Sequence, residues 1–294
     1  MQIAQKILVT LMAMGLLFTF EGCTSCNSKN KPETNVTTEN NTGIEQNNTT
    51  PVTVTQTSLK LSIDKTSLNK DENTTVKVMV NHSDGSSREV TSQVEWIVSM
   101  NHTLKVTDNT LKSLDDINTT LQAKLGSEVS NVVALELYWE VLGHRLPPRP
   151  DKTLNDSTLL GIDVNHNNVR DDVERWIYGT YKDKHPIHVD IGMQAARGYK
   201  LVLETPERAK EIRLKVDAAL FCNWYYWKDA KEFNEPLLVK ERMDTPVSSK
   251  YFNTKERKDI YLQYDKLLSG GVYDSPWADE MKSFCDFNIS KYGE

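Results

Sequence analysis

The chain lacks an excess of basic residues, and this bears on the partners it can bind. Of its 294 residues, 35 are Lys or Arg and 41 are Asp or Glu, which gives a formal net charge of −6. A protein that binds along a phosphate backbone usually carries a basic patch or stripe. The charge balance therefore argues against nucleic acid as a partner.

Recognisable catalytic motifs are also missing. The sequence contains no Gly-x-Ser-x-Gly, no His-Glu-x-x-His, no phosphate-binding loop and no dinucleotide fingerprint. His185 and His188, with Asp190 nearby, have a spacing that can hold zinc but also occurs in ordinary loops. The aromatic run at 224–227 could stack on sugar rings, although such a run in a helix more often belongs to a core with a partly exposed edge. No enzymatic activity follows from these patterns.

Cysteine is scarce, with only Cys23, Cys26, Cys222 and Cys285 in the whole chain. Cys222 and Cys285 lie in the C-terminal part and have neither the Cys-x-x-Cys nor the Cys/His spacing of a zinc site. In an oxidising compartment such a pair is expected to form a disulfide. A catalytic thiol is the alternative.

The N-terminus has the features of an export signal over residues 1–22. Lys6 supplies positive charge, and residues 7–20 form an apolar run too short for an ordinary membrane span. The following Phe20-Glu21-Gly22-Cys23 resembles the lipobox of bacterial lipoproteins, which prefers Leu at the position of Phe20 and a small residue at Glu21. This resemblance implies lipidation of Cys23 and attachment to a membrane. The residue after Cys23 is Thr24 rather than Asp, and in such lipoproteins this implies the outer membrane of the cell envelope. An ordinary secretory signal cut nearby and an uncleaved anchor are the alternatives.

Composition divides the next part of the chain into three segments. Residues 23–55 contain Asn, Thr, Ser and Glu with almost no apolar side chains, so we expect a disordered tether. Residues 56–140 alternate apolar and polar side chains, as at Val76, Val78 and Val80, and Asp84-Gly85 marks a hairpin turn. This pattern predicts an antiparallel sandwich. Residues 141–162 form a linker stiffened by the segment LPPRP at 146–150.

The β-rich segment resembles a bacterial immunoglobulin-like domain of group 2. The resemblance rests on Leu61-Ser62-Ile63, on the segment SDGSSREVT at 83–91 and on Val94-Glu95-Trp96. The Gly-rich turn of the family's later half has no clear counterpart. The resemblance implies an all-β immunoglobulin-like sandwich without a catalytic site, which serves as a spacer or adhesive module at a cell surface.

Residues 163–294 are predicted to form an all-α helical domain. Thr205-Pro206 is typical of a helix start, Asn253 with Glu256 forms a capping box, and Gly270-Gly271 ends a helix. Between the first two signals, apolar residues recur at helical spacing. This predicted buried face consists of Ala209, Ile212, Val216, Ala219, Leu220, Asn223 and Trp227.

The segment DVNHNNVRDDVE at 163–174 has the oxygen spacing of a calcium loop. Side-chain oxygens fall at positions 1, 3, 5, 9 and 12, and a backbone carbonyl is available at position 7. Asn168 occupies the sixth position, where the chain must turn sharply and where Asn tolerates left-handed dihedral angles. The predicted Ca²⁺ ligands are Asp163, Asn165, Asn167, Val169, Asp171 and Glu174.

This loop resembles EF-hand and thrombospondin type 3 calcium loops. Val169 and Asp171 match the repeat pattern, whereas Arg170 stands where an EF-hand prefers an apolar residue. The two Asn ligands dilute the negative charge, so we expect a single structural site of weak affinity, on the order of 10⁻⁴ to 10⁻³ M. It would pin the linker onto the first helix of the helical domain. The alternative is an Asp-rich helix start in which Asp171 and Asp172 complement the helix dipole.

Together these features predict a lipid-anchored, non-enzymatic protein of the cell envelope. A tether and an immunoglobulin-like spacer would present a calcium-clamped helical domain to a cell-surface protein or glycan. The rival is an envelope enzyme with an unrecognised active site in the helical domain, with His185 and His188 as first candidates. A cleft that combines these histidines with carboxylates of raised pKa would favour the enzyme. A continuous apolar core without such a cleft would favour the binding protein.

Overall fold

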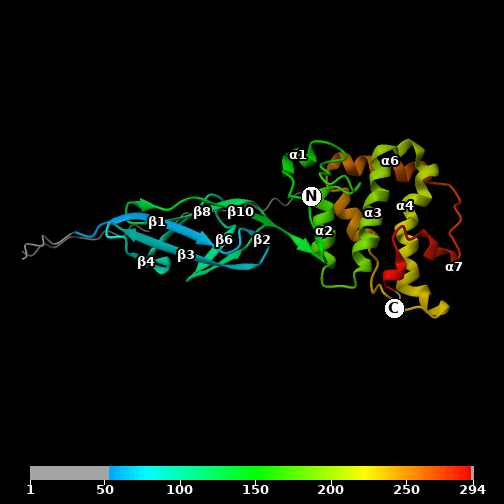
Figure 1. Ribbon diagram of the computed structural model, residues 1–294. Coiled ribbons are helices and arrows are strands. Elements are labelled where there is room, and N and C mark those ends of the chain that lie inside the picture. The colour runs from blue at the N-terminus through cyan, green and yellow to red at the C-terminus, as the bar shows by residue number, and fades with distance from the viewer. Residues whose placement is uncertain (1–52, 293–294) are drawn as a thin grey trace, which may run out of the picture. The chain divides into compact units, whose positions relative to one another are not determined.

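The computed structural model describes residues 53–292. A β-sheet region at 56–145 is followed by a helical region at 152–292, as the sequence predicted (Figure 1). The signal peptide, most of the tether and the lipidation site Cys23 lie outside the described residues.

The strands form two main sheets. The first has the order β1 (Gln56–Ile63), β3 (Asn73–His82), β7 (Thr110–Ser113) and β6 (Leu104–Thr107), with β4 (Ser87–Glu89) also paired to β3. The second has the order β2 (Ser67–Asn69), β10 (Val133–Tyr138), β8 (Thr119–Leu125) and β5 (Glu95–Val98), with β9 (Glu128–Val129) beside β8. All pairs are antiparallel except β2 with β10, which is parallel. A hairpin of β11 (Glu140–Val141) and β12 (His144–Arg145) extends the β-sheet region past the predicted boundary at 140.

The two main sheets share one apolar core, so they form a sandwich. Alternation places Val76, Val78 and Val80 of β3 in this core while their neighbours Lys77 and Met79 are less buried. Full burial of one such side chain contributes roughly 1.5–3 kcal/mol. The core also contains residues of both sheets and of the connection after β4: Leu59, Leu61, Leu68, Val90, Leu111, Leu121, Ala123, Leu135 and Leu137.

The predicted hairpin turn lies between β3 and β4. His82 donates its backbone N–H to the Ser86 carbonyl at 2.9 Å, and Gly85 has φ +83°. Glycine adopts this left-handed conformation without the steric cost that other residues meet. The turn prediction from Asp84-Gly85 is therefore confirmed.

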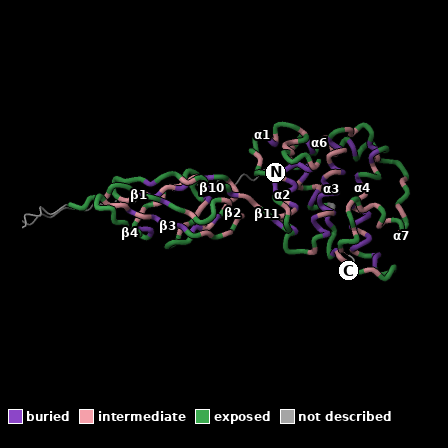
Figure 2. Tube along the Cα trace, in the orientation of Figure 1, coloured by how far each residue is buried: buried purple, intermediate pink, exposed green. Residues whose placement is uncertain are grey.

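The helical region is built around α3, most of whose residues are buried (Figure 2). Gly198 lets α4 come close to α3, since a Cβ at this glycine would lie 3.2 Å from Val216 Cα. The helices are α1 (Lys152–Asp156), α2 (Asp171–Tyr181), α3 (Ile187–Glu204), α4 (Ala209–Trp224), α5 (Asp244–Tyr251), α6 (Lys255–Leu268) and α7 (Ala278–Met281). Shorter helical turns are η1 (Thr91–Gln93) in the β-sheet region and η2 (Pro206–Arg208), η3 (Tyr225–Asp229), η4 (Ala230–Phe233), η5 (Lys282–Phe284) and η6 (Ile289–Tyr292).

Two helix boundaries differ in detail from the sequence prediction. The N-cap of α6 is Thr254, whose Oγ1 accepts a hydrogen bond from the Arg257 backbone N–H at 3.3 Å. The predicted cap, Asn253, is wrong by one residue because its amide oxygen accepts from arginine side chains instead. Thr205-Pro206 begins the short turn η2, and α4 follows at Ala209.

The predicted disulfide between Cys222 and Cys285 is present and ties the C-terminal segment to α4. The two cysteines are 63 residues apart. A cross-link of this span restricts the unfolded chain and stabilises the folded one by roughly 2–5 kcal/mol. The neighbouring aromatic run has Tyr225 and Tyr226 buried and its two tryptophans half-buried, so its prediction as core with an exposed edge is confirmed.

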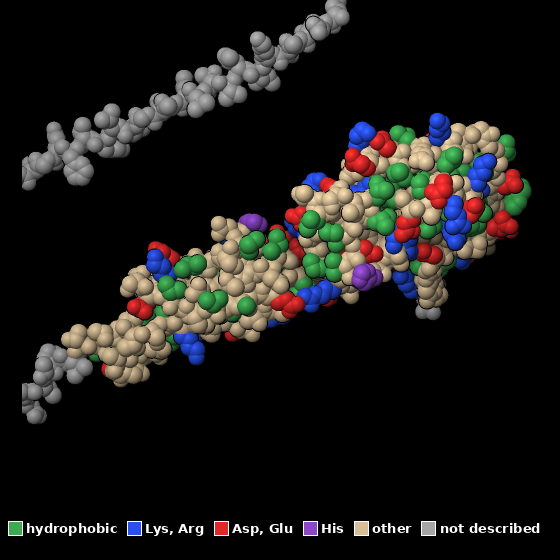
Figure 3. All heavy atoms as spheres, turned by 90° about the horizontal axis from the view of Figure 1, so that it is seen from above, with side chains coloured by type: hydrophobic (Ala, Val, Ile, Leu, Met, Phe, Trp, Pro, Cys, Tyr) green, Lys and Arg blue, Asp and Glu red, His purple; other side chains and the backbone are tan. Residues whose placement is uncertain are grey.

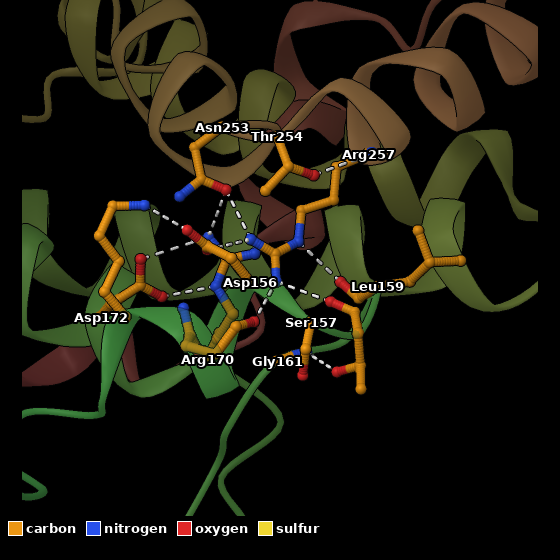
Figure 4. Close-up of polar contacts among 12 residues, drawn as sticks. Asp156, Ser157, Leu159, Gly161, Arg170, Asp172, Asn253, Thr254 and Arg257 are labelled. Atoms are coloured by element: carbon orange, nitrogen blue, oxygen red, sulfur yellow. Dashed lines mark hydrogen bonds and ion pairs between the residues drawn. The ribbon is translucent and has the colours of Figure 1, made fainter.

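Arg257 of α6 is fully buried, and its guanidinium donates hydrogen bonds to the end of α1 and the segment that follows it (Figure 4). Its Nε donates to the Leu159 carbonyl at 2.9 Å, and its Nη2 donates to the carbonyls of Asn155 at 2.7 Å and Thr158 at 2.9 Å. Its Nη1 forms an ion pair with Asp156 at 3.1 Å. The planar guanidinium thus satisfies several carbonyls that no helix or strand would satisfy.

Arg170, just before α2, is the second buried arginine of this network, with 2% of its surface exposed. Its Nε donates to Asp172 Oδ1 at 2.5 Å and its Nη1 to the Tyr251 carbonyl at 3.1 Å. Asn253 Oδ1 accepts from both Arg170 and Arg257 (Figure 4). The network therefore connects the start of α2 to the junction of α5 and α6.

Replacing Arg257 by Leu is expected to lower the free energy of unfolding by about 3–5 kcal/mol, because it leaves the carbonyls of Asn155, Thr158 and Leu159 without this donor and removes one partner of Asp156. Arg257→Lys should also destabilise, since an ammonium cannot reproduce the planar fork. Urea denaturation measures both effects. The control is Lys258→Ala at the exposed next position, which should change stability by no more than about 0.5 kcal/mol. Equal effects at the two positions would contradict the assignment.

Candidate functional site

The loop at 163–174 turns sharply and then enters α2. His166 has φ +55° and Asn168 has φ +67°, so the sixth position adopts the left-handed conformation expected from the sequence. Asp163 accepts the backbone N–H of Asn167 at 3.2 Å with Oδ1 and that of Asn168 at 3.0 Å with Oδ2. Asp163, the first predicted ligand, thus stabilises the turn by accepting two of its backbone N–H groups.

Glu174, the last predicted ligand, lies in the first turn of α2 with no exposed surface. Its Oε2 accepts from the side-chain amides of Asn167 at 2.8 Å and Asn165 at 3.1 Å. Its Oε1 lies 2.6 Å from Nε2 of His144, a residue of β12. The structure therefore brings Asn165, Asn167 and Glu174 together, and adds a histidine that the sequence reasoning did not identify.

Asp171 is also fully buried and accepts the Val164 backbone N–H at 3.1 Å. Burial, together with the nearby charges of Glu174 and Asp163, raises the pKa of its carboxyl group to about 6. Within residues 53–292, no lysine or arginine forms an ion pair with any of these three carboxylates. The loop therefore concentrates negative charge beside buried surface.

The side chains of the loop do not point their oxygens at one common centre. Among the described residues, no group of three or more His, Cys, Asp or Glu side chains is arranged to hold a metal ion. Asn165 and Asn167 direct their NH₂ groups at Glu174, so a donor occupies the place where a cation would need an acceptor. Rotation of each amide by half a turn would present its oxygen instead. The calcium ligand set stays a prediction.

Arg170 stands where an EF-hand prefers an apolar residue, and its contacts show how the loop accommodates it. Its side chain is buried at a position expected to be apolar, and its guanidinium lies 5.0 Å from the centre of the Tyr251 ring. The aliphatic part lies against Gly161, which has φ +67° and where a Cβ would be only 2.2 Å from Arg170 Cδ. Asn168 Oδ1 also accepts from Lys200 of α3 at 2.7 Å. Arg170 thus fills a buried position that an apolar side chain fills in an EF-hand, and it attaches the loop to the helical region.

Arg175, the residue after Glu174, contacts the β-sheet region and the linker. It forms an ion pair with Asp116 at 2.5 Å, in which the two side chains are only 8% and 3% exposed. Its Nη1 donates to the Pro147 carbonyl at 2.8 Å, and its guanidinium lies 5.2 Å from the centre of the Trp139 ring. Trp139 also lies against Gly179, where a Cβ would be 2.8 Å from the ring. The four residues 174, 175, 178 and 179 form what we call the joint face of α2.

His144 completes the contacts of the joint face. Its ring stacks on Tyr178 with centroids 4.8 Å apart while its Nε2 contacts Glu174. The β-sheet and helical regions accordingly belong to one compact unit in the described chain. Contacts made by single residues such as Asp116, Trp139, His144 and Arg175 give no periodic or spacing signal, which is why the sequence did not identify them.

His185 and His188, the candidates for the enzyme alternative, line a groove of about 580 Å³. His188 is 3% exposed, and its Nδ1 lies 2.8 Å from the His185 carbonyl, so Nδ1 is the donor. Its Nε2 is buried without a hydrogen-bond partner in the described structure, and burial lowers the pKa of both histidines. The other lining residues are Asp183, Lys184, Leu237, Leu238, Lys240 and Glu241.

Among the described residues, His185, His188 and Asp190 do not form a group that could hold a metal ion. Asp190 forms an ion pair with Lys291 at 2.6 Å and accepts a hydrogen bond from the Tyr292 hydroxyl. Among the described residues, the carboxyl groups whose pKa is raised belong to Asp171 and Asp217, and neither lines the groove of the histidines. The groove therefore combines the histidines with Asp183 and Glu241, and the two carboxyl groups of raised pKa, Asp171 and Asp217, lie elsewhere.

Comparison with known proteins adds no relatives, because no protein-family model and no curated protein matches the chain. None of the helices between residues 53 and 292 combines the length and apolar character that crossing a membrane requires. On the face drawn in Figure 3, Lys and Arg are interspersed with Asp and Glu over the helical region. That face carries no patch of a single sign.

Replacing Asp171 by Asn in metal-free buffer at pH 7 is expected to raise the free energy of unfolding by roughly 1–3 kcal/mol. The pKa is raised from about 4 to about 6 in the folded protein, so stability falls as the pH rises from about 4 to about 6, and at pH 7 the full cost of the charge is present. Asn removes that charge and keeps an oxygen for the Val164 N–H. Urea denaturation with a chelator present measures the change. The exposed Asp183→Asn is the control, and a loss of stability in Asp171→Asn would contradict the prediction.

Proposed function

We propose that the protein is a lipid-anchored, non-enzymatic binding protein of the cell envelope, with a calcium-dependent joint between its two regions. The observation that carries this proposal is that the first turns of α2 serve two purposes. The same turns supply two carboxylates of the predicted calcium loop and the charged contacts to the β-sheet region. Occupancy of the loop would therefore set how firmly the helical region is held.

The chemistry of the loop supports calcium as the ion. Two fully buried carboxylates and a third beside them repel one another, and amide and backbone oxygens lie within the same turn. Carboxylate and amide oxygens are the donors that calcium prefers in proteins. A bound Ca²⁺ would neutralise this repulsion. The ligands would be Asp163, Asn165, Asn167, Asp171 and Glu174, with the carbonyl of Val169.

The β-sheet region supports the role of a spacer. Its two sheets share a closed apolar core, and its predicted likeness to an immunoglobulin-like module implies no catalytic group. The buried ion pair between Asp116 and Arg175 attaches this region to α2. Such a spacer would hold the helical region away from the membrane to which Cys23 is attached, where a surface protein or glycan can reach it.

Calcium at about 10 mM is expected to stabilise the purified full chain by about 1–3 kcal/mol, given the affinity expected of such a loop. Thermal unfolding with calcium or with chelator measures the effect as a rise in Tm of several degrees. Glu174→Gln and Asp163→Asn should abolish the calcium-induced rise. Glu207→Gln, an exposed change of the same kind, should retain it. If calcium leaves the Tm of the unmodified chain unchanged, the proposal that calcium binds the loop and stabilises the joint is refuted.

Lipidation of Cys23 is tested in cells of the source organism or in a bacterium that processes lipoproteins. The unmodified chain is expected in the detergent-soluble membrane fraction, and Cys23→Ser should move it to the soluble fraction or leave its signal uncut. Cys26→Ser, three residues away, is the matched control and should not change the fractionation. A Cys23→Ser chain that is cut at its signal and still found in the membrane fraction would contradict the anchor, and the calcium measurement would remain valid.

An envelope enzyme is the second candidate, and the buried, unpartnered Nε2 of His188 favours it. This nitrogen carries a lone pair beside the groove, which is the arrangement of a general base. If the protein is an enzyme, His188→Gln should abolish turnover and leave the calcium-dependent Tm unchanged. A binding protein should instead retain its envelope partner in a pull-down with His188→Gln.

A further inference from the structure

The helical region contains a cavity of about 200 Å³ between α3, α4 and α6. Ala195 of α3 and Ala219 of α4 are both among its lining residues and are 5% exposed. Protein interiors are close-packed, and voids larger than a water molecule are few in a domain. Small side chains on facing helices leave this volume open.

Tyrosine rings form one wall of the cavity. Tyr199 comes from α3, and Tyr261 and Tyr264 come from α6 with their rings stacked at a centroid distance of 6.4 Å. The face of an aromatic ring is negative and attracts cations. Tyr264 is 4% exposed, and its hydroxyl has no hydrogen-bond partner among the described residues. A buried hydroxyl without a partner is costly, so a ligand that pairs with it gains free energy.

Two carboxylates lie among the same lining residues. Asp217 pairs with Arg213 at 3.1 Å, yet burial still raises the pKa of the Asp217 carboxyl group. Asp265 is exposed and has no ion pair with any described residue. The charges of Asp217 and Asp265 contribute to raising the pKa of Tyr264. Arg213 offsets the charge of Asp217 and Asp265 has no ion pair among the described residues, so the surplus charge of these three groups is negative.

We propose that this cavity binds a small organic ammonium ion. Tyrosine faces would contact the cation, Asp265 and Asp217 would supply opposite charge, and the Tyr264 hydroxyl would pair with a polar group of the ligand. An anion would be repelled by the carboxylates, and a neutral molecule of equal shape would gain only the apolar contacts. This inference goes beyond the anchored, calcium-clamped function and depends on neither calcium nor lipidation.

Choline and its neutral isostere 3,3-dimethyl-1-butanol are the probes, because they match in shape and differ in charge. Binding to the purified full chain is measured by saturation-transfer NMR and by calorimetry, with chelator present. Choline is expected to bind at least tenfold more tightly than the isostere. Equal affinity would overturn the ammonium specificity, and the absence of choline binding would overturn the site. Either failure leaves the calcium-induced rise in Tm unaffected.

Variants locate the binding in this cavity. Asp265→Asn, an exposed change that should not disturb folding, is expected to weaken choline binding at least threefold, and Tyr264→Phe should weaken it as well. Ala219→Leu fills the cavity and should abolish binding, with circular dichroism to check the fold. Asp259→Asn, an exposed change on the same helix, is the matched control and should bind like the unmodified chain. Unchanged choline affinity in both Asp265→Asn and Tyr264→Phe would overturn the assignment.

Discussion

Buried charge at the start of α2 is the constraint on which the arrangement of the chain depends. Glu174 and Arg175 are adjacent and nearly inaccessible to water, so each must have a partner of opposite or compatible chemistry. Arg175 finds Asp116 in the β-sheet region, which fixes that region on the helix. Glu174 finds two amides of the loop and His144. Loop and joint are therefore parts of one charged cluster, and a change in one alters the other.

The arginines on the opposite side of the loop have a complementary role. Arg170 donates to a carbonyl at the end of α5, Arg257 donates to a carbonyl of the irregular segment after α1, and both donate to the side-chain oxygen of Asn253. The loop is thus held at its end by the helical region, while its carboxylates have no lysine or arginine partner among the described residues. A rigid frame around unneutralised oxygens is the physical basis for expecting a cation there.

The sequence predicted what periodicity and turn chemistry determine. Alternation at Val76, Val78 and Val80, the turn at Gly85, the helix break near Gly270 and the disulfide of Cys222 with Cys285 are all present. The cap of α6 was missed by one residue because Asn253 is held by arginines distant in sequence. The contacts of Arg170, Arg175, Asp116 and His144 were not predicted, because a single charged residue shows no local sign of burial. The left-handed Asn168 was predicted, whereas the hydrogen bonds from the Asn165 and Asn167 amides to Glu174 were not.

The central claim is that an ion in the loop tightens the joint between the two regions. Hydrogen–deuterium exchange of the full chain, with calcium and with chelator, tests it most directly because it reports local opening element by element. The account predicts that calcium slows exchange in the first turns of α2 and in the hairpin of β11 and β12, with the sandwich core unchanged. Identical exchange of these segments under the two conditions would contradict it.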